Sequence, residues 1–420
     1  MGAQTLDHKV KKLQRFLLGD VAQGLALTGK EDITDVLLRG HPAFGGKLFR
    51  KAYQLIRKAI GDNYTIFVSL AGPVTVSDYA RVWIIPFIKA GYISAFTASD
   101  AISYHDAHDA VEGRRKIYDV DMYGDDGKYR DAQIIRVTDL GFPEEVLFNT
   151  DKFMTHVLMQ PDFQRELTTT EYRWLLGKYI HALETKREIP HGLLATAFSY
   201  DVPGFCPSPA DGSTYLNKMK VWALQHRLGI NLNQNSEMNL DKDVYEFCAL
   251  HKWAQKHEGN KELAYIVCGG GAAKNYMLQP EPALEQILSI PTKKYKIGVQ
   301  FTTAPVTDGS LTSCWPSEAI SWGKLQKGAM TVSVPADYTT CMTIIAYAIL
   351  KERAKYEDLL ETKYRGNKGK LFEKHPQARG FLREPARLYR KREDAMELLD
   401  SELKAHLPKI METMPQGLRL

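Results

Sequence analysis

The segment SEAISWGK, residues 317–324, holds three side chains that could act together on an amine substrate. Glu318 can bind an ammonium group through its charge, and Trp322 can cover a cation with the face of its indole ring. Lys324 can act as a nucleophile near neutral pH if desolvation or a nearby positive charge keeps its amine neutral. An exposed lysine beside a packed tryptophan is the commoner arrangement, and spacing alone favours it. The segment therefore leaves two interpretations open, a nucleophilic lysine or a surface lysine.

A glycine-rich turn and two short DGS motifs suggest a nucleotide site. The segment YIVCGGGAAKN, residues 265–275, runs from an apolar stretch into three glycines that include Gly270 and Gly271. Backbone without side chains can approach a phosphate closely and bind it through N–H groups. The pattern is not GxGxxG, so a tight strand-to-helix turn explains it about equally well. Asp211 and Asp308, in ADGS and TDGS, can bind ribose hydroxyls or cap a helix, and the three motifs together favour a nucleotide.

The segment YHDAHDAVEG, residues 104–113, places His105 and His108 on one face of a helix, where two imidazoles could bind a metal. A polar helix start is the alternative, because acidic side chains there interact favourably with the helix dipole. We favour the second interpretation and predict no metal site. The five cysteines are scattered and form no CxxC pair, so neither a zinc site nor a disulfide framework is predicted.

The elements that must position these residues are short apolar runs that alternate with helical patterns. The runs are rich in Val, Ile, Phe and Thr and are apolar on both faces, which is typical of buried parallel strands. They are residues 64–70, 93–99, 132–137, 192–200, 263–268, 296–303 and 330–336, and the helical patterns include residues 151–187, 216–228 and 242–258. This alternation predicts an α/β fold, a doubly wound, Rossmann-like, mostly parallel sheet with helices on both faces. Ligands bind such sheets at the carboxyl ends of the strands.

The two ends of the chain differ from this central part. Near the N-terminus, Leu6, Val10, Leu13 and Leu17 have helical spacing, which predicts an amphipathic helical arm. We therefore expect three parts: an N-terminal helical arm (1–60), a catalytic α/β domain (61–350) and a basic, mainly helical C-terminal extension (351–420). The extension holds 17 Lys and Arg against 12 Asp and Glu, and so carries the whole net charge of +5. A solvated helical face explains this excess, and nucleic-acid binding is not expected because no RNA-recognition motif accompanies it.

The composition is that of an ordinary globular protein, with 44% hydrophobic and 25% charged residues. No apolar run approaches the length of a membrane-spanning helix, and the start of the chain has no apolar core for a signal peptide. We therefore expect a cytoplasmic protein with no membrane partner.

Seven segments, in this order, resemble the deoxyhypusine synthase family, and most of all its bacterial deoxyhypusine synthase-like branch, which includes homospermidine synthases. They are TIFVSLAGPVT (65–75), SDAISYHDAH (99–108), GFCPSPADGS (204–213), GGGAAKN (269–275), TTAPVTDGS (302–310), SEAISWGK (317–324) and VPADYTT (334–340). The resemblance covers roughly residues 60–350. The set is specific, although no single segment would be.

The resemblance implies an NAD-dependent transfer of an aminobutyl group from a polyamine, spermidine or putrescine, to an acceptor amine. Lys324 matches the family's nucleophile, which carries the group as a Schiff base. Matched substrate positions are Glu318, Trp322, Asp106, Tyr104, Gly309, Ser310 and Asn275. Matched NAD positions are Gly72, Pro73, Val74, Thr75, Ser99, Asp100, Asp211, Gly270, Gly271, Thr303, Ala304, Asp308, Asp337 and Tyr338. The family also implies a homotetramer with sites between subunits.

Several positions depart from the enzymes that modify a protein. Asn275 and Tyr276 replace two histidines, and the bacterial branch also carries Asn at the first of these positions. Leu216 and Leu311 replace two substrate-binding aspartates, and Tyr104 replaces an acid. These departures favour a homospermidine or related polyamine product. The alternatives are a true deoxyhypusine synthase, which modifies a lysine of a translation factor, and a non-catalytic relic that binds NAD.

Overall fold

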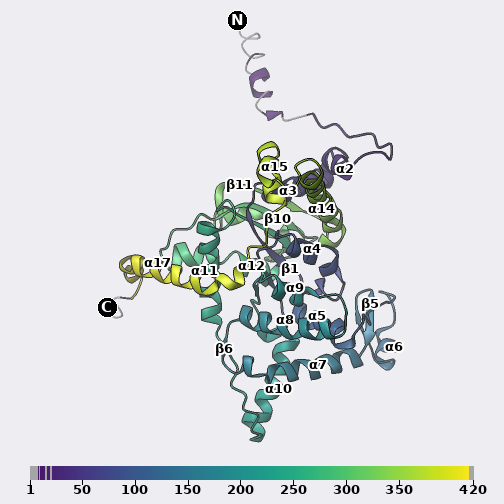
Figure 1. The fold of residues 1–420 in the computed structure, drawn as a ribbon, viewed down its shortest axis with the longest axis vertical. Coiled ribbons are helices and arrows are strands. Elements are labelled where there is room, and N and C mark those ends of the chain that lie inside the picture. Colours follow the sequence, from purple (N-terminus) through teal and green to yellow (C-terminus); the bar gives the residue numbers. More distant parts are fainter. Residues whose placement is uncertain (1–7, 9, 15–16, 19–20, 416–420) are drawn as a thin grey trace.

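The computed structural model describes residues 8, 10–14, 17–18 and 21–415, and its main feature is a six-stranded parallel sheet (Figure 1). In spatial order the strands are β11 (Leu325–Val334), β10 (Tyr295–Phe301), β9 (Leu263–Cys268), β1 (Thr65–Leu70), β2 (Ala95–Ala98) and β7 (Gly204–Phe205). Every neighbouring pair is parallel. The predicted α/β class is therefore confirmed.

Both faces of the sheet are covered, which explains why every residue of β1, β2 and β9 is buried. Ile66 and Val68 of β1 belong to one core cluster, and Phe67 between them belongs to a second cluster on the other face. Side chains alternate between the two faces of a strand, so each face buries its own set. The first cluster includes α3 (Phe44–Gly61) and α14 (Tyr338–Thr362), and the second includes α11 (Leu240–His257), α12 (Gly271–Met277) and α17 (Arg392–Glu412).

Other helices complete the two layers and the periphery. They are α2 (Ile33–Arg39), α4 (Ile85–Lys89), α5 (Ala101–Glu112), α6 (Asp126–Asp131), α7 (Glu145–Leu158), α8 (Thr169–Lys186), α9 (Leu193–Ser199), α10 (Ser213–Leu228), α13 (Pro280–Pro282), α15 (Lys368–Lys374) and α16 (Ala378–Phe381). Within the described ranges, two small sheets lie outside the main one: the antiparallel set β3 (Tyr118–Asp119), β5 (Leu140–Pro143) and β4 (Ile134–Val137), and the pair β6 (Glu166–Leu167) and β8 (Glu237–Met238).

Three predicted elements were wrong. The run 192–200 is helix α9, whose first two N–H groups donate to the carboxylate of Asp106 at 2.8 and 2.7 Å. The run 132–137 contains β4, which pairs only with β5 in the small antiparallel sheet rather than joining the main one. The helical pattern 151–187 is divided into α7 and α8, because Thr168 and Glu171 form a capping box that starts α8.

The predicted N-terminal helix, which includes Leu6, lies partly outside the described residues and stays a prediction. The C-terminal extension is helical, as expected, and it packs onto the body. Figure 1 shows α17 alongside α11, and α15 near α3. Leu388, Ala395 and Leu399 are buried in the second core cluster. The boundaries at 60 and 350 remain predictions. In the part of the chain that the structure describes, no helix is long and apolar enough to cross a membrane.

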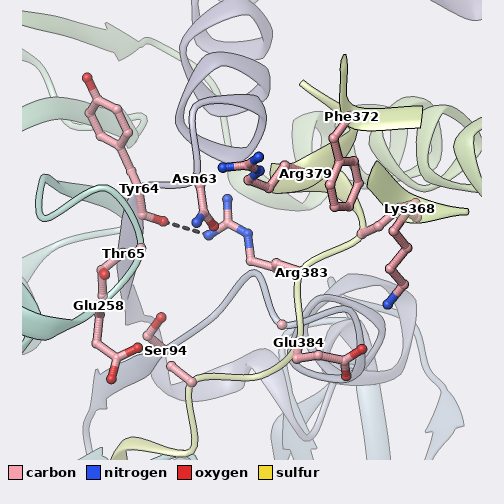
Figure 2. A pocket seen from close by; sticks show the side chains of 14 residues that line it. Asn63, Tyr64, Thr65, Ser94, Glu258, Lys368, Phe372, Arg379, Arg383 and Glu384 are labelled. Atoms are coloured by element: carbon pink, nitrogen blue, oxygen red, sulfur yellow. Dashed lines mark hydrogen bonds between the residues drawn. The ribbon is translucent and has the colours of Figure 1, made fainter. Parts of the chain in front are cut away.

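Arg383 anchors the extension at the amino ends of the strands (Figure 2). Its guanidinium donates to the carbonyls of Ile60 and Tyr64 at 2.5 and 2.6 Å, and more weakly to that of Ala59 at 3.3 Å. These carbonyls lie at the end of α3 and just before β1, where a cation complements the helix dipole. A cavity of about 320 Å³ opens beside this contact, with the exposed Arg379 also in its lining.

Candidate active site

A cavity of about 1000 Å³ brings together most of the predicted substrate residues. It lies between α12 with the segment after it and the loop that connects β10 to β11. The predicted residues that line it are Lys324, Glu318, Trp322, Asn275, Gly309 and Ser310. Because the connecting loop returns to the amino end of β11, Lys324 directly precedes that strand and does not lie at the carboxyl edge of the sheet.

Lys324 is half-buried, and among the described residues its amine has one hydrogen-bond acceptor. Its Nζ donates to Oδ1 of Asn275 at 3.0 Å. Burial lowers the pKa of the Lys324 amine below its ordinary value, although Cys314 nearby opposes this shift. The glycine before it has a positive φ of 69°, so Gly323 permits the turn that directs the chain into β11. A larger neutral fraction of the amine is the condition for nucleophilic attack.

A second lysine at the cavity, Lys274, was not predicted as a site residue. Its buried Nζ donates to the backbone carbonyls of Leu311 and Cys314, at 2.8 and 2.6 Å. Burial lowers the pKa of the Lys274 amine to about 8. These bonds fix the loop that forms one wall of the cavity. The GGGAAK segment contained this residue, but its partners are more than 35 positions away, and no local pattern reveals them.

Exposed aromatic and acidic side chains line the cavity. The side chains of Trp315 and Trp322 are 48% and 68% exposed although both line the cavity. Among the described residues that line it, Glu318 is the single carboxylate. Two indoles and one carboxylate suit a cationic guest, because a cation is attracted to an indole face as well as to a negative charge.

Apart from Asp211, the predicted NAD residues follow the carboxyl ends of five neighbouring strands, β11, β10, β9, β1 and β2. Backbone segments approach each other closely here: a Cβ on Gly72 would lie 2.9 Å from Oγ of Ser99. A Cβ on Gly270 would lie 2.6 Å from the Cα of Thr312. The predicted residues after the strands are Gly72, Pro73, Val74 and Thr75 after β1, Ser99 and Asp100 after β2, Gly270 and Gly271 after β9, Thr303, Ala304 and Asp308 after β10, and Asp337 and Tyr338 after β11. A glycine-lined edge of this kind fits a dinucleotide.

Not all of these side chains are free to bind a ligand. Asp100 is buried and accepts a hydrogen bond from the backbone N–H of Thr214 at 2.9 Å, and burial raises its pKa. Tyr338 is buried in the first core cluster. Asp211, Asp308 and Asp337 are exposed, so their carboxylates can reach a ribose or an amide.

The structure does not bring Tyr104 and Asp106 to the cavity, which corrects their expected placement with the other substrate residues. The Tyr104 hydroxyl donates to Asp151 Oδ1 at 2.9 Å, and Asp106 is buried as the cap of α9. Burial raises the pKa of Asp106 to about 6. Of the two leucines that replace aspartates, Leu311 lines the cavity, whereas Leu216 lies on α10 outside it.

The two histidines considered as metal ligands lie together inside the protein. The ring centroids of His105 and His108 are 4.9 Å apart, and His108 is buried against Phe142. Within the described ranges, no group of three or more His, Cys, Asp or Glu side chains could hold a metal ion.

Comparison with known proteins assigns the chain to a family. A family model described as deoxyhypusine synthase matches residues 38–349. A deoxyhypusine synthase-like protein of Nostoc sp. (strain PCC 7120) is 30% identical over 375 residues, which are 85% of this chain and 94% of the relative. Another, from Thermosynechococcus vestitus, is 31% identical over 325 residues, 76% of this chain and 78% of the relative.

A solved structure from Entamoeba histolytica, assigned to deoxyhypusine synthase, aligns with a TM-score of 0.50 at 12% identity. The alignment covers 78% of this chain and 96% of the other, and at this identity it supports the fold alone. The family model and the two sequence relatives carry the assignment. The chain therefore belongs to the deoxyhypusine synthase family of transferases.

Proposed function

We propose that this protein transfers an aminobutyl group from spermidine or putrescine, through an imine on Lys324, to an acceptor amine. The product is homospermidine or a related polyamine. The observation that carries the proposal is a half-buried lysine with a lowered pKa in the wall of a large cavity that also presents Glu318 and two indoles.

The side chains of the cavity support each part of this chemistry. The neutral amine of Lys324 attacks the imine carbon of the oxidised donor, and the amine that formed the original imine leaves. The acceptor amine then attacks the lysine imine in the same way and frees Lys324. Asn275 holds the lysine amine in position through its amide oxygen. Partial burial protects the imine from water.

NAD is the cofactor of the family in general, and we propose that this chain uses it. When bound, NAD would supply hydride transfer, first from the carbon beside the donor nitrogen and finally back to the last imine. The backbone at Gly72–Thr75 and at Gly270 and Gly271 would hold its phosphates, because the glycines let a ligand approach the backbone closely. Thr303, Ala304 and the exposed Asp337 would contact the remainder of the molecule.

A small acceptor amine fits this site better than a protein lysine. The positions that hold two histidines in the protein-modifying enzymes hold Asn275 and Tyr276 here, and both side chains are already engaged. Asn275 binds Lys324, and the Tyr276 hydroxyl donates to Asp243 at 2.6 Å. Neither group is available as an imidazole-like proton shuttle.

We also propose that the chain acts as a homotetramer with sites between subunits. The exposed Trp315, Trp322 and Leu311 support this arrangement, because a partner subunit would cover these apolar side chains at the mouth of the cavity. Partner residues would also supply the charges that a polyamine needs beyond Glu318.

Chemical trapping tests the proposal. The protein is incubated with NAD and, separately, with spermidine, putrescine, homospermidine and agmatine, then reduced with borohydride, digested and analysed by mass spectrometry. We expect an NAD-dependent aminobutyl adduct on Lys324. Lys324→Ala and Lys324→Arg should give none, since a guanidinium stays protonated and forms no imine. Lys327→Ala, at an exposed lysine three residues away, is the matched control and should keep the adduct.

The outcomes separate the alternatives. Absence of an adduct with every amine, in protein that binds NAD, would reject the proposed transferase activity and leave the non-catalytic interpretation. Transfer to a lysine of a translation factor, but to no small amine, would identify a true deoxyhypusine synthase.

A further inference from the structure

The wall of the cavity beside Lys324 depends on a buried tyrosine contact. Tyr276 of α12 donates its hydroxyl to Oδ2 of Asp243 at 2.6 Å. Its ring stacks on Phe247, with centroids 5.4 Å apart and an angle of 5° between the planes, and both rings line the cavity. Asn275, the residue before Tyr276, accepts the hydrogen bond of Lys324. The Tyr276 hydroxyl therefore fixes the helix that presents the acceptor for the lysine amine.

Asp243 is one of two buried carboxylates on α11. Asp243 and Glu246 are three residues apart, so they lie on the same helical face, and their exposed fractions are 1% and 0%. Thr169 of α8 donates its backbone N–H and its hydroxyl to Asp243, at 2.7 and 2.8 Å. Burial raises the pKa of both carboxylates; the charge of Glu246 adds to the shift of Asp243, and the charge of Glu171 adds to the shift of Glu246. Asp243 is held by these hydrogen bonds, whereas Glu246 needs a neighbouring cation to remain ionised.

Arg392 supplies this cation from the C-terminal extension. It is the first residue of α17 and is 9% exposed. Its Nε and Nη2 donate to the two carboxylate oxygens of Glu246, at 2.5 and 2.9 Å, and Nη2 lies 3.2 Å from Oε1 of Glu171. A bidentate contact of this kind needs the planar guanidinium group. Loss of one partner from such a buried pair leaves the other charge uncompensated.

We propose that Arg392 is a positioning residue that acts on Lys324 through Glu246 and α12. By binding Glu246 of α11 and Glu171 of α8 at once, Arg392 holds in place the turn of α11 on which Asp243 accepts the Tyr276 hydroxyl. That contact keeps α12 in place, and water is excluded from the lysine amine. Arg392 lies beyond residues 38–349, the part that the family model matches, so the extension contributes something to the site that the family pattern does not contain.

The inference rests on the nucleophilic role proposed for Lys324, so its test measures the lysine without any substrate or cofactor. The full-length protein is labelled with acetic anhydride over a range of pH, and modification of Lys324 is quantified by mass spectrometry. The variants are Arg392→Met, Arg392→Lys and Tyr276→Phe, and thermal unfolding is measured for each. A missing borohydride adduct in the wild type would reject the proposed function, whereas the labelling result would still decide the present inference.

Arg390→Met is the matched control. Arg390 also belongs to the extension, and its Nε pairs with Oδ2 of Asp201 at 2.7 Å. Asp201 keeps a second arginine, Arg387, at 2.9 Å when Arg390 is removed. The control therefore removes a charge from the same segment without disturbing the contacts around Glu246.

We expect Arg392→Met and Tyr276→Phe to admit water to Lys324 and raise its labelling midpoint by about half a pH unit, which slows labelling at neutral pH about threefold. Arg392→Lys keeps the charge but not the paired bonds, and it should give an intermediate shift. If Arg392→Met does not fold, the midpoint of Arg392→Lys tests the proposed role of Arg392. Arg390→Met should keep the wild-type midpoint. The inference is overturned if the Arg392 variants unfold at lower temperature with an unchanged midpoint, or if Arg390→Met shifts it equally.

Discussion

Two lysines meet at the cavity, and their surroundings suit them to different tasks. Lys274 is buried, and two backbone carbonyls accept from its amine. Lys324 is half-buried, and Asn275 is its one acceptor in the part of the chain that the structure describes. An amine with two short bonds to the backbone is committed to holding a loop, whereas an amine with one bond to an amide can leave it to react. This difference supports Lys324 as the nucleophile.

The substitution Glu318→Gln tests how the cavity recognises an amine. The change removes the one carboxylate among the described lining residues and keeps the size of the side chain. We expect KM for the amine donor to rise about tenfold with a smaller change in kcat, because an ammonium group loses a charged partner. Steady-state kinetics with each donor measure this effect.

The control for this variant is Glu285→Gln. Glu285 pairs with Lys294 at 2.5 Å and is not among the lining residues of the cavity, so its loss should leave KM unchanged. An unchanged KM in Glu318→Gln would show that the ammonium group is bound elsewhere, for instance by a partner subunit.

Helix α5 carries two histidines whose rings pack against each other. His105 and His108 are packed together, and within the described residues both ring nitrogens of His108 lack a hydrogen-bond partner. Burial lowers the pKa of His105 to about 4 and that of His108 to about 3. Both imidazoles are therefore neutral in the folded protein at pH 5 to 7.

This pair predicts a loss of stability in acid. An unfolded imidazole takes up a proton near its ordinary pKa of about 6.5, whereas the folded pair resists protonation until pH falls to about 4 or below. The unfolded chain then binds more protons than the folded one, so the free energy of unfolding falls as pH drops from about 6.5 to about 4. His108→Phe should reduce this slope and raise stability at neutral pH, because it removes two unpaired buried nitrogens.

Urea unfolding at a series of pH values measures both effects. His226→Phe, at an exposed histidine of α10, is the control and should leave the slope unchanged. An unaltered slope in His108→Phe would mean that His108 is protonated in the folded protein.

The sequence predicted the strands better than it predicted the helices and loops around them. Val, Ile and Phe runs identified β1, β2, β9, β10 and β11. The first three are buried throughout and need side chains that suit an apolar interior on both faces, whereas β11, at the edge of the sheet, was found from its apolar second half alone. The same rule failed at 192–200, where an equally apolar run is helix α9, since periodicity does not separate a short buried helix from a buried strand. Strand β7 has two residues and leaves no pattern to detect.

The residues of the candidate site also fall into two groups, those that the sequence could place together and those that it could not. Glu318, Trp322 and Lys324 lie within one contiguous segment, so the sequence could place them together. Lys274 and Arg392 act through partners between 37 and 221 positions away, and such contacts have no local signature. Long-range partners of this kind became visible only in the structure.

In the whole molecule, the C-terminal extension behaves as part of the core and not as an appendage. Arg383 joins it to the end of α3, and burial lowers the pKa of its guanidinium to about 10. Arg383→Met should lower the free energy of unfolding by about 3 kcal/mol, since several buried carbonyls lose a charged donor together. Urea denaturation monitored by tryptophan fluorescence measures the change.

Arg379→Met provides the comparison. Arg379 is exposed and lies 5.6 Å from the ring of Phe372, with no carboxylate partner in the described part of the chain. Its loss should change stability by less than about 1 kcal/mol. Equal effects of the two variants would contradict the anchoring role of Arg383.

The position of Leu388, Ala395 and Leu399 in the second core cluster affects how the chain can fold while it is being translated. These residues pack in the same cluster as Phe67 of β1, more than 300 positions earlier in the chain. A ribosome releases Phe67 long before the residues that must cover it, so this face of the sheet cannot close while translation continues. The nascent chain therefore carries exposed apolar surface almost to termination, which makes it a natural client for chaperones.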